Sequence, residues 1–115
     1  MQITFDLFFN SRRQWVRVTI WEVARDFYAK FGDCIGIYWG NEDRKPKVGE
    51  FGQIHLLQSK LDDELASHEL LHFLIDLVRT RNGQITPRNE EKIVSEYGQM
   101  VKQFWKKYNK ILGEV

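Results

Sequence analysis

The sequence has 115 residues and a mass of 13.8 kDa, the length of one compact domain. Hydrophobic residues make up 43% and charged residues 29%, a balance that excludes a disordered chain, and the net charge of +1 argues against a dedicated nucleic-acid-binding protein. The single cysteine, Cys34, excludes an internal disulfide and a cysteine-rich zinc site. Neither a signal peptide nor an apolar run of the roughly 20 residues that span a bilayer is present. We therefore expect a cytoplasmic, single-domain protein without a membrane partner.

The first part of the sequence predicts a β-hairpin and a short helix. Apolar and polar residues alternate over residues 3–7 and 15–20, and residues 10–14 form a polar turn between them. Apolar residues then recur at helical spacing over residues 21–31, and Gly32 is placed to end that helix.

The second part predicts two strands and two long helices. The apolar run 34–39 and the alternating run 53–58 are typical of strands, and the intervening glycines, proline and charges predict a loop or flap over 40–52. Asp62 or Asp63 is expected to cap a helix that ends near residues 81–83, and Thr86-Pro87 precedes a final helix over 88–110. This order of elements predicts an α+β fold.

The pentapeptide His68-Glu69-Leu70-Leu71-His72 lies within the first long helix and carries the strongest chemical signal. Residues four positions apart lie on one helix face, so both imidazoles can reach the same metal ion. Glu69 lies beside them, where it could take a proton from a metal-bound water. The alternative is a helix with two ordinary histidines, in which a metal-free core is packed by Leu65, Leu71, Ile75 and Val78.

A catalytic zinc site needs a third protein ligand, which the final helix offers as Glu90, Glu91 or Glu96. Helical geometry places Glu96 well off the apolar stripe of that helix, which favours exposure to solvent. Glu90 lies near the centre of the stripe. Glu91 lies at its edge and is followed at helical spacing by Ser95 and Gly98, small residues that allow two helices to approach closely. Geometry alone leaves Glu90 and Glu91 as alternatives.

Residues 66–72, followed by Glu91-x-x-Val94-Ser95-x-Tyr97-Gly98-x-x-Val101, resemble the ImmA/IrrE-type zinc metallopeptidases of the gluzincin kind. In that family an A-x-H-E-x-x-H helix is followed by E-x-x-A-N-x-F-A-x-x-L, and the likeness covers about residues 52–101. The resemblance implies a small zincin-like domain, in which N-terminal strands and one helix precede the HExxH helix and a C-terminal ligand helix. It also implies Zn²⁺ bound by His68, His72 and Glu91, Glu69 as general base, and a peptide or protein substrate.

Such a peptidase needs a group that stabilises the developing oxyanion, and Tyr97, Tyr38 and His55 are the candidates. For each of them, a packing role is the more frequent one in proteins. The predicted strand 53–58 could pair with an extended peptide if it forms the edge of the sheet. The alternative function is a non-catalytic binding or regulatory module that retains the zincin-like fold.

Two further features have simple structural interpretations. Cys34 lies in an apolar run, which favours a buried and unreactive thiol over a zinc ligand. In residues 104–110 the aromatic side chains fall at helical spacing with lysines opposite, a pattern typical of a packed face and a solvated face rather than of nucleic-acid stacking.

Overall fold

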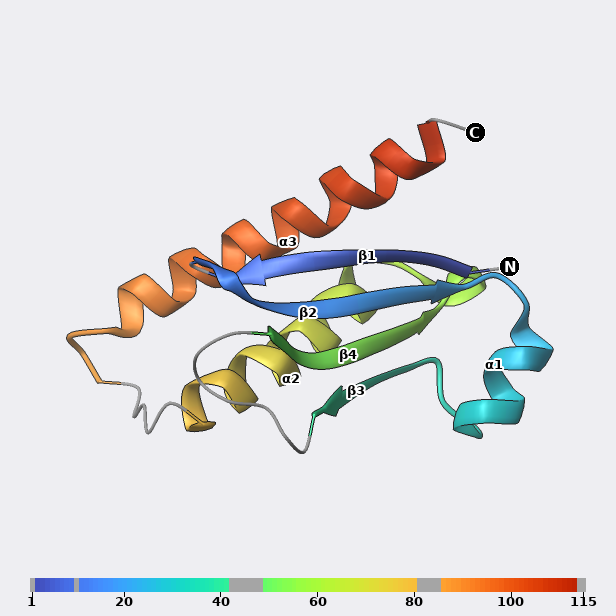
Figure 1. Ribbon diagram of the computed structural model, residues 1–115, viewed down its shortest axis with the longest axis horizontal. Helices are drawn as coiled ribbons and strands as arrows, with labels where there is room; N and C mark the ends of the chain where they lie inside the picture. Colours follow the sequence, from blue (N-terminus) through green and yellow to red (C-terminus); the bar gives the residue numbers. More distant parts are fainter. Residues whose placement is uncertain (1, 10, 42–48, 81–85, 114–115) are drawn as a thin grey trace.

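The computed structural model describes residues 2–9, 11–41, 49–80 and 86–113. The elements in chain order are β1 (Gln2–Phe9), β2 (Ser11–Trp21), α1 (Ala24–Phe31), β3 (Gly36–Gly40), β4 (Gly49–Leu57), a 3-10 turn (Gln58–Lys60), α2 (Asp63–Thr80) and α3 (Glu90–Gly113). The strands form one sheet in the order β1-β2-β4-β3 (Figure 1). The predicted α+β class is confirmed. No helix within these ranges is long and apolar enough to cross a membrane.

The main core lies between the sheet and the helices α2 and α3. Alternation along the strands directs one set of apolar side chains towards these helices, and the helical period directs another set back towards the sheet. Both sets are buried: Phe5, Leu7, Val16, Val18, Ile20, Ile54 and Leu56 from the strands, and Leu65, Leu70, Phe73, Leu77, Met100 and Phe104 from the helices. The opposite sheet face carries a smaller cluster of Trp21, Phe27 and Leu57, where α1 packs.

The predicted hairpin is confirmed, but its strands are longer than expected. Strands β1 and β2 pair antiparallel over most of their length, and residues 11–14 belong to β2 rather than to a turn. The strand extends through Gln14 because this residue is buried and pairs with Gly49 of β4. At the other end, Trp21 pairs with Gln2 and Leu57, so α1 begins at Ala24 instead of Trp21. Asn10 lies outside the described residues.

The prediction that residues 53–58 form a sheet edge is wrong. Strand β4 lies inside the sheet, parallel to β2 on one side and antiparallel to β3 on the other. It also begins at Gly49, so residues 49–52 are strand rather than the expected loop, and residues 42–48 lie outside the described ranges. Alternation along a strand reports which face is buried and carries no information about its neighbours.

The two outer strands of the sheet, β1 and β3, have different neighbours along their free edges. Along β1, the backbone N–H of Phe8 donates to Oε1 of Gln103 at 2.9 Å, and Nζ of Lys107 donates to the carbonyl of Asp6 at 2.6 Å. Side chains of α3 therefore satisfy part of that edge, which limits its pairing with another chain. The other edge is β3, which lies above α2.

The helix signals were mostly correct. Oδ1 of Asp62 accepts a hydrogen bond of 2.8 Å from the backbone N–H of Leu65, which is the expected cap of α2. Residues 81–83, the expected end of that helix, lie outside the described residues. Helix α3 begins at Glu90 rather than 88, and Phe104 and Tyr108 are buried while Lys106 and Lys110 are exposed. The predicted packed and solvated faces of residues 104–110 are confirmed.

Candidate metal centre

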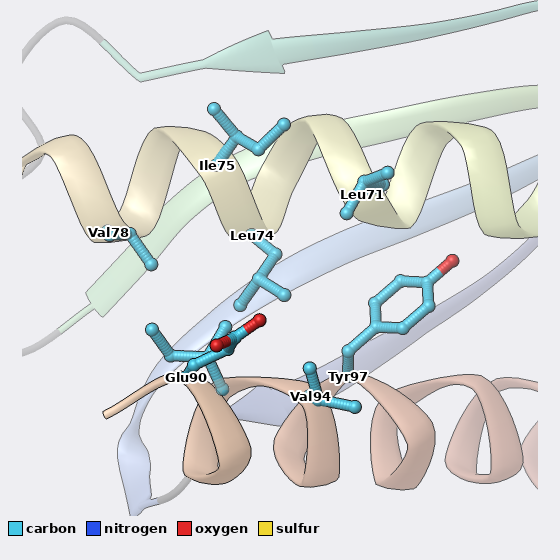
Figure 2. Close-up of a pocket in the computed structure, with 8 residues that line it drawn as sticks. Leu71, Leu74, Ile75, Val78, Glu90, Val94 and Tyr97 are labelled. Carbon is cyan, nitrogen blue, oxygen red and sulfur yellow. The ribbon is translucent and has the colours of Figure 1, made fainter. Parts of the chain in front are cut away.

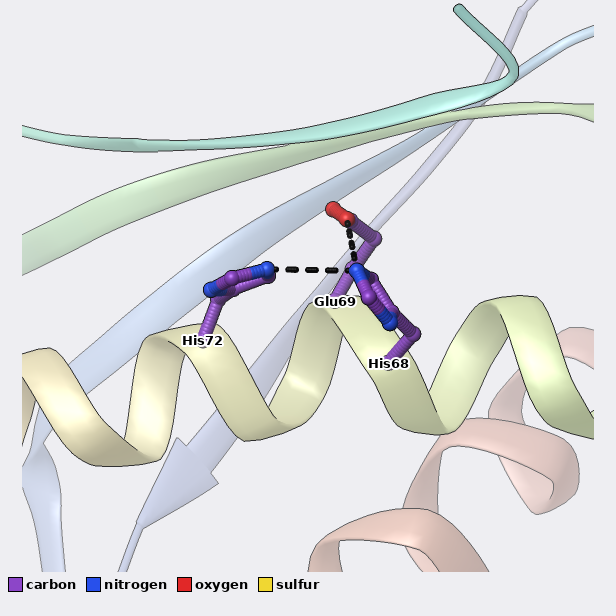
Figure 3. Close-up of side chains that lie close together, drawn as sticks. All are labelled: His68, Glu69 and His72. Carbon is purple, nitrogen blue, oxygen red and sulfur yellow. Dashed lines mark hydrogen bonds and ion pairs between the residues drawn. The ribbon is translucent and has the colours of Figure 1, made fainter.

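Helix α2 brings His68, Glu69 and His72 into one group (Figure 3). Nε2 of His68 lies 3.2 Å from Nε2 of His72 and 3.8 Å from Oε1 of Glu69. Candidate ligand atoms of all three side chains lie within 4.8 Å of one another. The two imidazoles are exposed and Glu69 is buried. One helical turn separates the histidines, so the local sequence alone sets this arrangement.

Glu69 is buried because the outer strand passes close to α2 at Gly36. A Cβ atom added at Gly36 would lie 3.3 Å from Cγ of Glu69 and 2.8 Å from Cδ1 of Leu65. Only 5% of Glu69 is exposed, and its buried Oε2 has no hydrogen-bond partner among the described residues. Burial raises the pKa of the Glu69 carboxyl, while the charges of His68 and His72 oppose that rise. A buried carboxylate oxygen left without a partner costs stability and therefore points to a functional site.

The donor atoms suit a zinc ion. Two nitrogens bound to a tetrahedral Zn²⁺ at about 2.0 Å lie about 3.3 Å apart, close to the 3.2 Å between the two histidine nitrogens. Imidazole nitrogen and carboxylate oxygen are ordinary zinc ligands. The same separation also fits a hydrogen bond between two neutral rings.

The third ligand predicted on α3 does not join this group. Among the described residues the group consists of His68, Glu69 and His72, without Glu90 or Glu91. Glu90 lines a groove between α2 and α3 (Figure 2), and Glu91 is exposed. Glu96, expected in solvent, is half-buried. The assignment of Glu91 as a ligand stays a prediction.

The three candidates for oxyanion stabilisation occupy different places. The hydroxyl of Tyr38 donates to Oδ2 of Asp76 at 2.6 Å, one turn of α2 beyond His72. The hydroxyl of Tyr97 donates to the carbonyl of Ser67 at 2.9 Å, next to His68. Both tyrosines therefore hold elements against α2, in contacts that a packing role explains.

His55 lies on the other face of the sheet and takes no part in the candidate metal centre. Its ring accepts a hydrogen bond of 3.0 Å from Nε1–H of Trp21 at Nδ1, and its Nε2 lies 2.9 Å from Oε1 of Gln53. The first bond requires a proton on Nε2, so the ring is neutral in this network. Burial, with a smaller contribution from the charge of Lys30, lowers the pKa of His55 to about 4.

A cleft of about 460 Å³ opens beside the metal centre, between the residues before β3 and the start of α2. Cys34, Gly36, His68 and Glu69 are among its lining residues. Cys34 is half-buried, and its Sγ lies 3.6 Å from the carbonyl of Phe31. The expectation of a buried thiol is therefore wrong, because the apolar run begins at residues that line this cleft. Sequence periodicity gave no sign that Cys34 and Glu69 share it.

A second, apolar groove of about 220 Å³ runs between α2 and α3 (Figure 2). Leu71 and Ile75, which the metal-free alternative places in the core, line this groove and are 44% and 38% exposed. On α2 they lie three positions beyond His68 and His72, respectively, so apolar surface adjoins the imidazoles. The other two residues of that alternative differ, because Leu65 is buried and Val78 is half-buried.

The sequence matches no protein-family model, and no curated protein or solved structure is significantly similar to it.

Proposed function

We propose that this protein is a zinc-dependent peptidase of zincin-like architecture. The observation that carries the proposal is the pair of imidazole nitrogens 3.2 Å apart beside the buried carboxylate of Glu69. A structural metal site needs no such carboxylate, whereas hydrolysis needs a base next to the ion.

In this proposal His68 and His72 hold the ion through Nε2, and Glu91 is the proposed third ligand. When bound, Zn²⁺ supplies a Lewis acid that lowers the pKa of water and polarises the scissile carbonyl. Glu69 acts as general base: its Oε1, which lies beside His68, would accept the proton of the attacking water and return it to the leaving amine. The apolar environment that buries Glu69 suits this role, because it favours uptake of the proton.

The edge of the sheet supports a peptide as the substrate. The N–H of Leu57 donates to the carbonyl of Ile35, and the N–H of Asn41 donates to the carbonyl of Phe51. Along residues 35–41, the backbone groups of every second residue therefore point towards β4. The backbone groups of Gly36 therefore point away from β4, towards the open side of the sheet. An extended peptide added there would run alongside Gly36, which lies against Glu69. This role falls to β3 instead of the predicted residues 53–58.

One observation favours the second candidate, a non-catalytic binding or regulatory module. The described metal group contains two histidines and Glu69 but no carboxylate from α3. A protein that never assembles a third ligand would hold zinc weakly and would lack hydrolytic activity.

Elemental analysis of the protein, purified without a histidine tag, tests the proposal. We expect about one zinc per chain, its loss in His68→Ala and His72→Ala, and its retention in Glu69→Gln. His55→Gln is the matched control, because it removes a histidine outside the centre and should retain zinc.

Hydrolysis of a quenched fluorescent casein then separates the two candidates. The peptidase proposal requires cleavage by the wild-type chain and its loss in Glu69→Gln. Zinc binding without any cleavage would favour the binding module, and absence of zinc from the wild-type chain would overturn both the metal site and the peptidase.

A further inference from the structure

The cleft beside the metal centre has an apolar base and a charged rim. Ile35, Gly36 and Leu65 supply the apolar wall, and Ile35 is 43% exposed. Lys60 and Glu64 are the exposed charged residues along its rim, together with Asp62 at the cap of α2. A ligand in this cleft would meet hydrocarbon along its length and charge at its end.

The charge in the cleft is mostly negative. Carboxylates come from Asp62, Glu64 and Glu69, against the single ammonium group of Lys60. Lys60 forms no ion pair with them within the described ranges. Asp62 also uses Oδ1 to cap Leu65. The local field therefore favours a cation.

A second, independent feature points to a ligand rather than to an ordinary acidic surface. Glu69 lines the same cleft and is 5% exposed, yet its Oε2 has no hydrogen-bond partner among the described residues. A buried acceptor of this kind is satisfied when a donor enters from the cleft. The donor could come from water or from a ligand, and the neighbouring carboxylates select a positively charged one.

We propose that this cleft is a subsite for a basic side chain, lysine or arginine, of the peptide substrate. The aliphatic stem of that side chain would lie along Ile35 and Leu65, and its cationic head would donate to Oε2 of Glu69, with Glu64 and Asp62 as neighbouring carboxylates. The proposal rests on the proposed peptidase function for its biological meaning, because it names the substrate class of that site. Binding in the cleft is nevertheless measurable without zinc or catalysis.

Cys34 provides that measurement, because the only cysteine of the chain lines the cleft. The probe is the peptide acetyl-Ala-Ala-Arg-Ala-Ala-amide, compared with the same peptide carrying leucine or glutamate in place of arginine. The rate at which neutral iodoacetamide alkylates Cys34 is measured with and without each peptide. A ligand at four times its Kd slows modification of a covered thiol about fivefold. We expect this protection from the arginine peptide and none from the other two.

Two charge reversals in the first turn of α2 make the test specific. Glu64→Lys changes a carboxylate that lines the cleft, whereas Asp63→Lys changes an equally exposed neighbour that does not. Protection by the arginine peptide should disappear in Glu64→Lys and persist in Asp63→Lys. Because each rate is compared with that of the same variant without peptide, any change in the intrinsic reactivity of Cys34 cancels.

The outcomes separate this inference from the peptidase proposal. Equal protection by the leucine peptide, no protection by any peptide, or undiminished protection in Glu64→Lys would each overturn the basic subsite. None of these results depends on zinc content or on hydrolysis. Conversely, a chain that binds no zinc but shows selective protection by the arginine peptide would retain the subsite and lose the peptidase.

Discussion

The hydroxyl of Tyr38 donates a hydrogen bond of 2.6 Å to Oδ2 of Asp76, which joins the outer strand β3 to α2 one turn beyond His72. At the start of β3, Gly36 lies against Leu65 and Glu69. Two contacts thus hold the outer strand against α2.

Tyr38→Phe removes the hydrogen bond from the middle of β3 to α2 while keeping the ring. We expect the free energy of unfolding to fall by about 1 kcal/mol, since the lost bond is partly buried and has a carboxylate as its acceptor. Urea unfolding measures the change. Tyr28→Phe is the control, because Tyr28 is exposed on α1 and its substitution should change stability by less than about 0.5 kcal/mol. Equal stability of the two variants would contradict a role for the Tyr38–Asp76 bond.

Gln103→Ala opens the other edge of the sheet. Gln103 accepts from the N–H of Phe8 at 2.9 Å, and its amide lies 3.4 Å from the carbonyl of Phe8. Its loss should lower the free energy of unfolding by about 1 kcal/mol and increase association at high concentration, because β1 then presents unsatisfied backbone groups. Denaturant unfolding and light scattering test the two effects. Gln99→Ala, an exposed site on the same helix, should change neither.

The third zinc ligand is tested by comparing Glu91→Gln with Glu90→Gln. If the ligand assignment is correct, Glu91→Gln lowers zinc affinity by about tenfold or more, because an amide is a weaker ligand than a carboxylate. Glu90 faces the apolar groove between α2 and α3, so Glu90→Gln should leave the affinity unchanged. A competitive chelator titration gives both values. The opposite order would assign the ligand to Glu90, and no effect of either would exclude both and leave Glu96 as the remaining candidate on α3.

Local sequence predicted helix α2 and the approach of its two histidines well, because both depend on residues within a few turns of one another. The spacing of His68 and His72 sets their approach, and Asp62 caps the helix that carries them. The alternation of side chains along β4 could also have excluded His55 from the candidate metal centre. His55 lies between the core residues Ile54 and Leu56, so its side chain points to the opposite face of the sheet.

The rest of the site depends on contacts between distant segments. The position of β4 inside the sheet follows from its parallel pairing with β2, which no local pattern encodes. The same holds for the cleft, where Cys34 and Gly36 meet the start of α2. The close approach of β3 to α2 requires a residue without a Cβ atom at position 36. The sequence alone does not show which of the chain's glycines lies at such a contact.

His55→Gln tests the buried network on the opposite sheet face through its pH dependence. The pKa of His55 is about 4 in the folded chain and about 6.5 in the unfolded chain, so below pH 6.5 the unfolded state binds a proton that the folded state does not. Stability contributed by neutral His55 is therefore present above pH 6.5 and falls as the pH drops towards 4. The loss amounts to about 3 kcal/mol for a shift of this size.

Glutamine can accept from Trp21 and donate to Gln53 without titrating, so the variant should lose less stability than the wild type between pH 7 and pH 4. Urea unfolding at pH 7, 5.5 and 4 gives the free energy of unfolding of both chains. Titration of the carboxylates contributes equally to both, so the difference between the chains reports on His55. Parallel curves for the two chains would show that His55 is protonated as readily in the folded state as in the unfolded one, and that its burial against Trp21 does not exclude the charge.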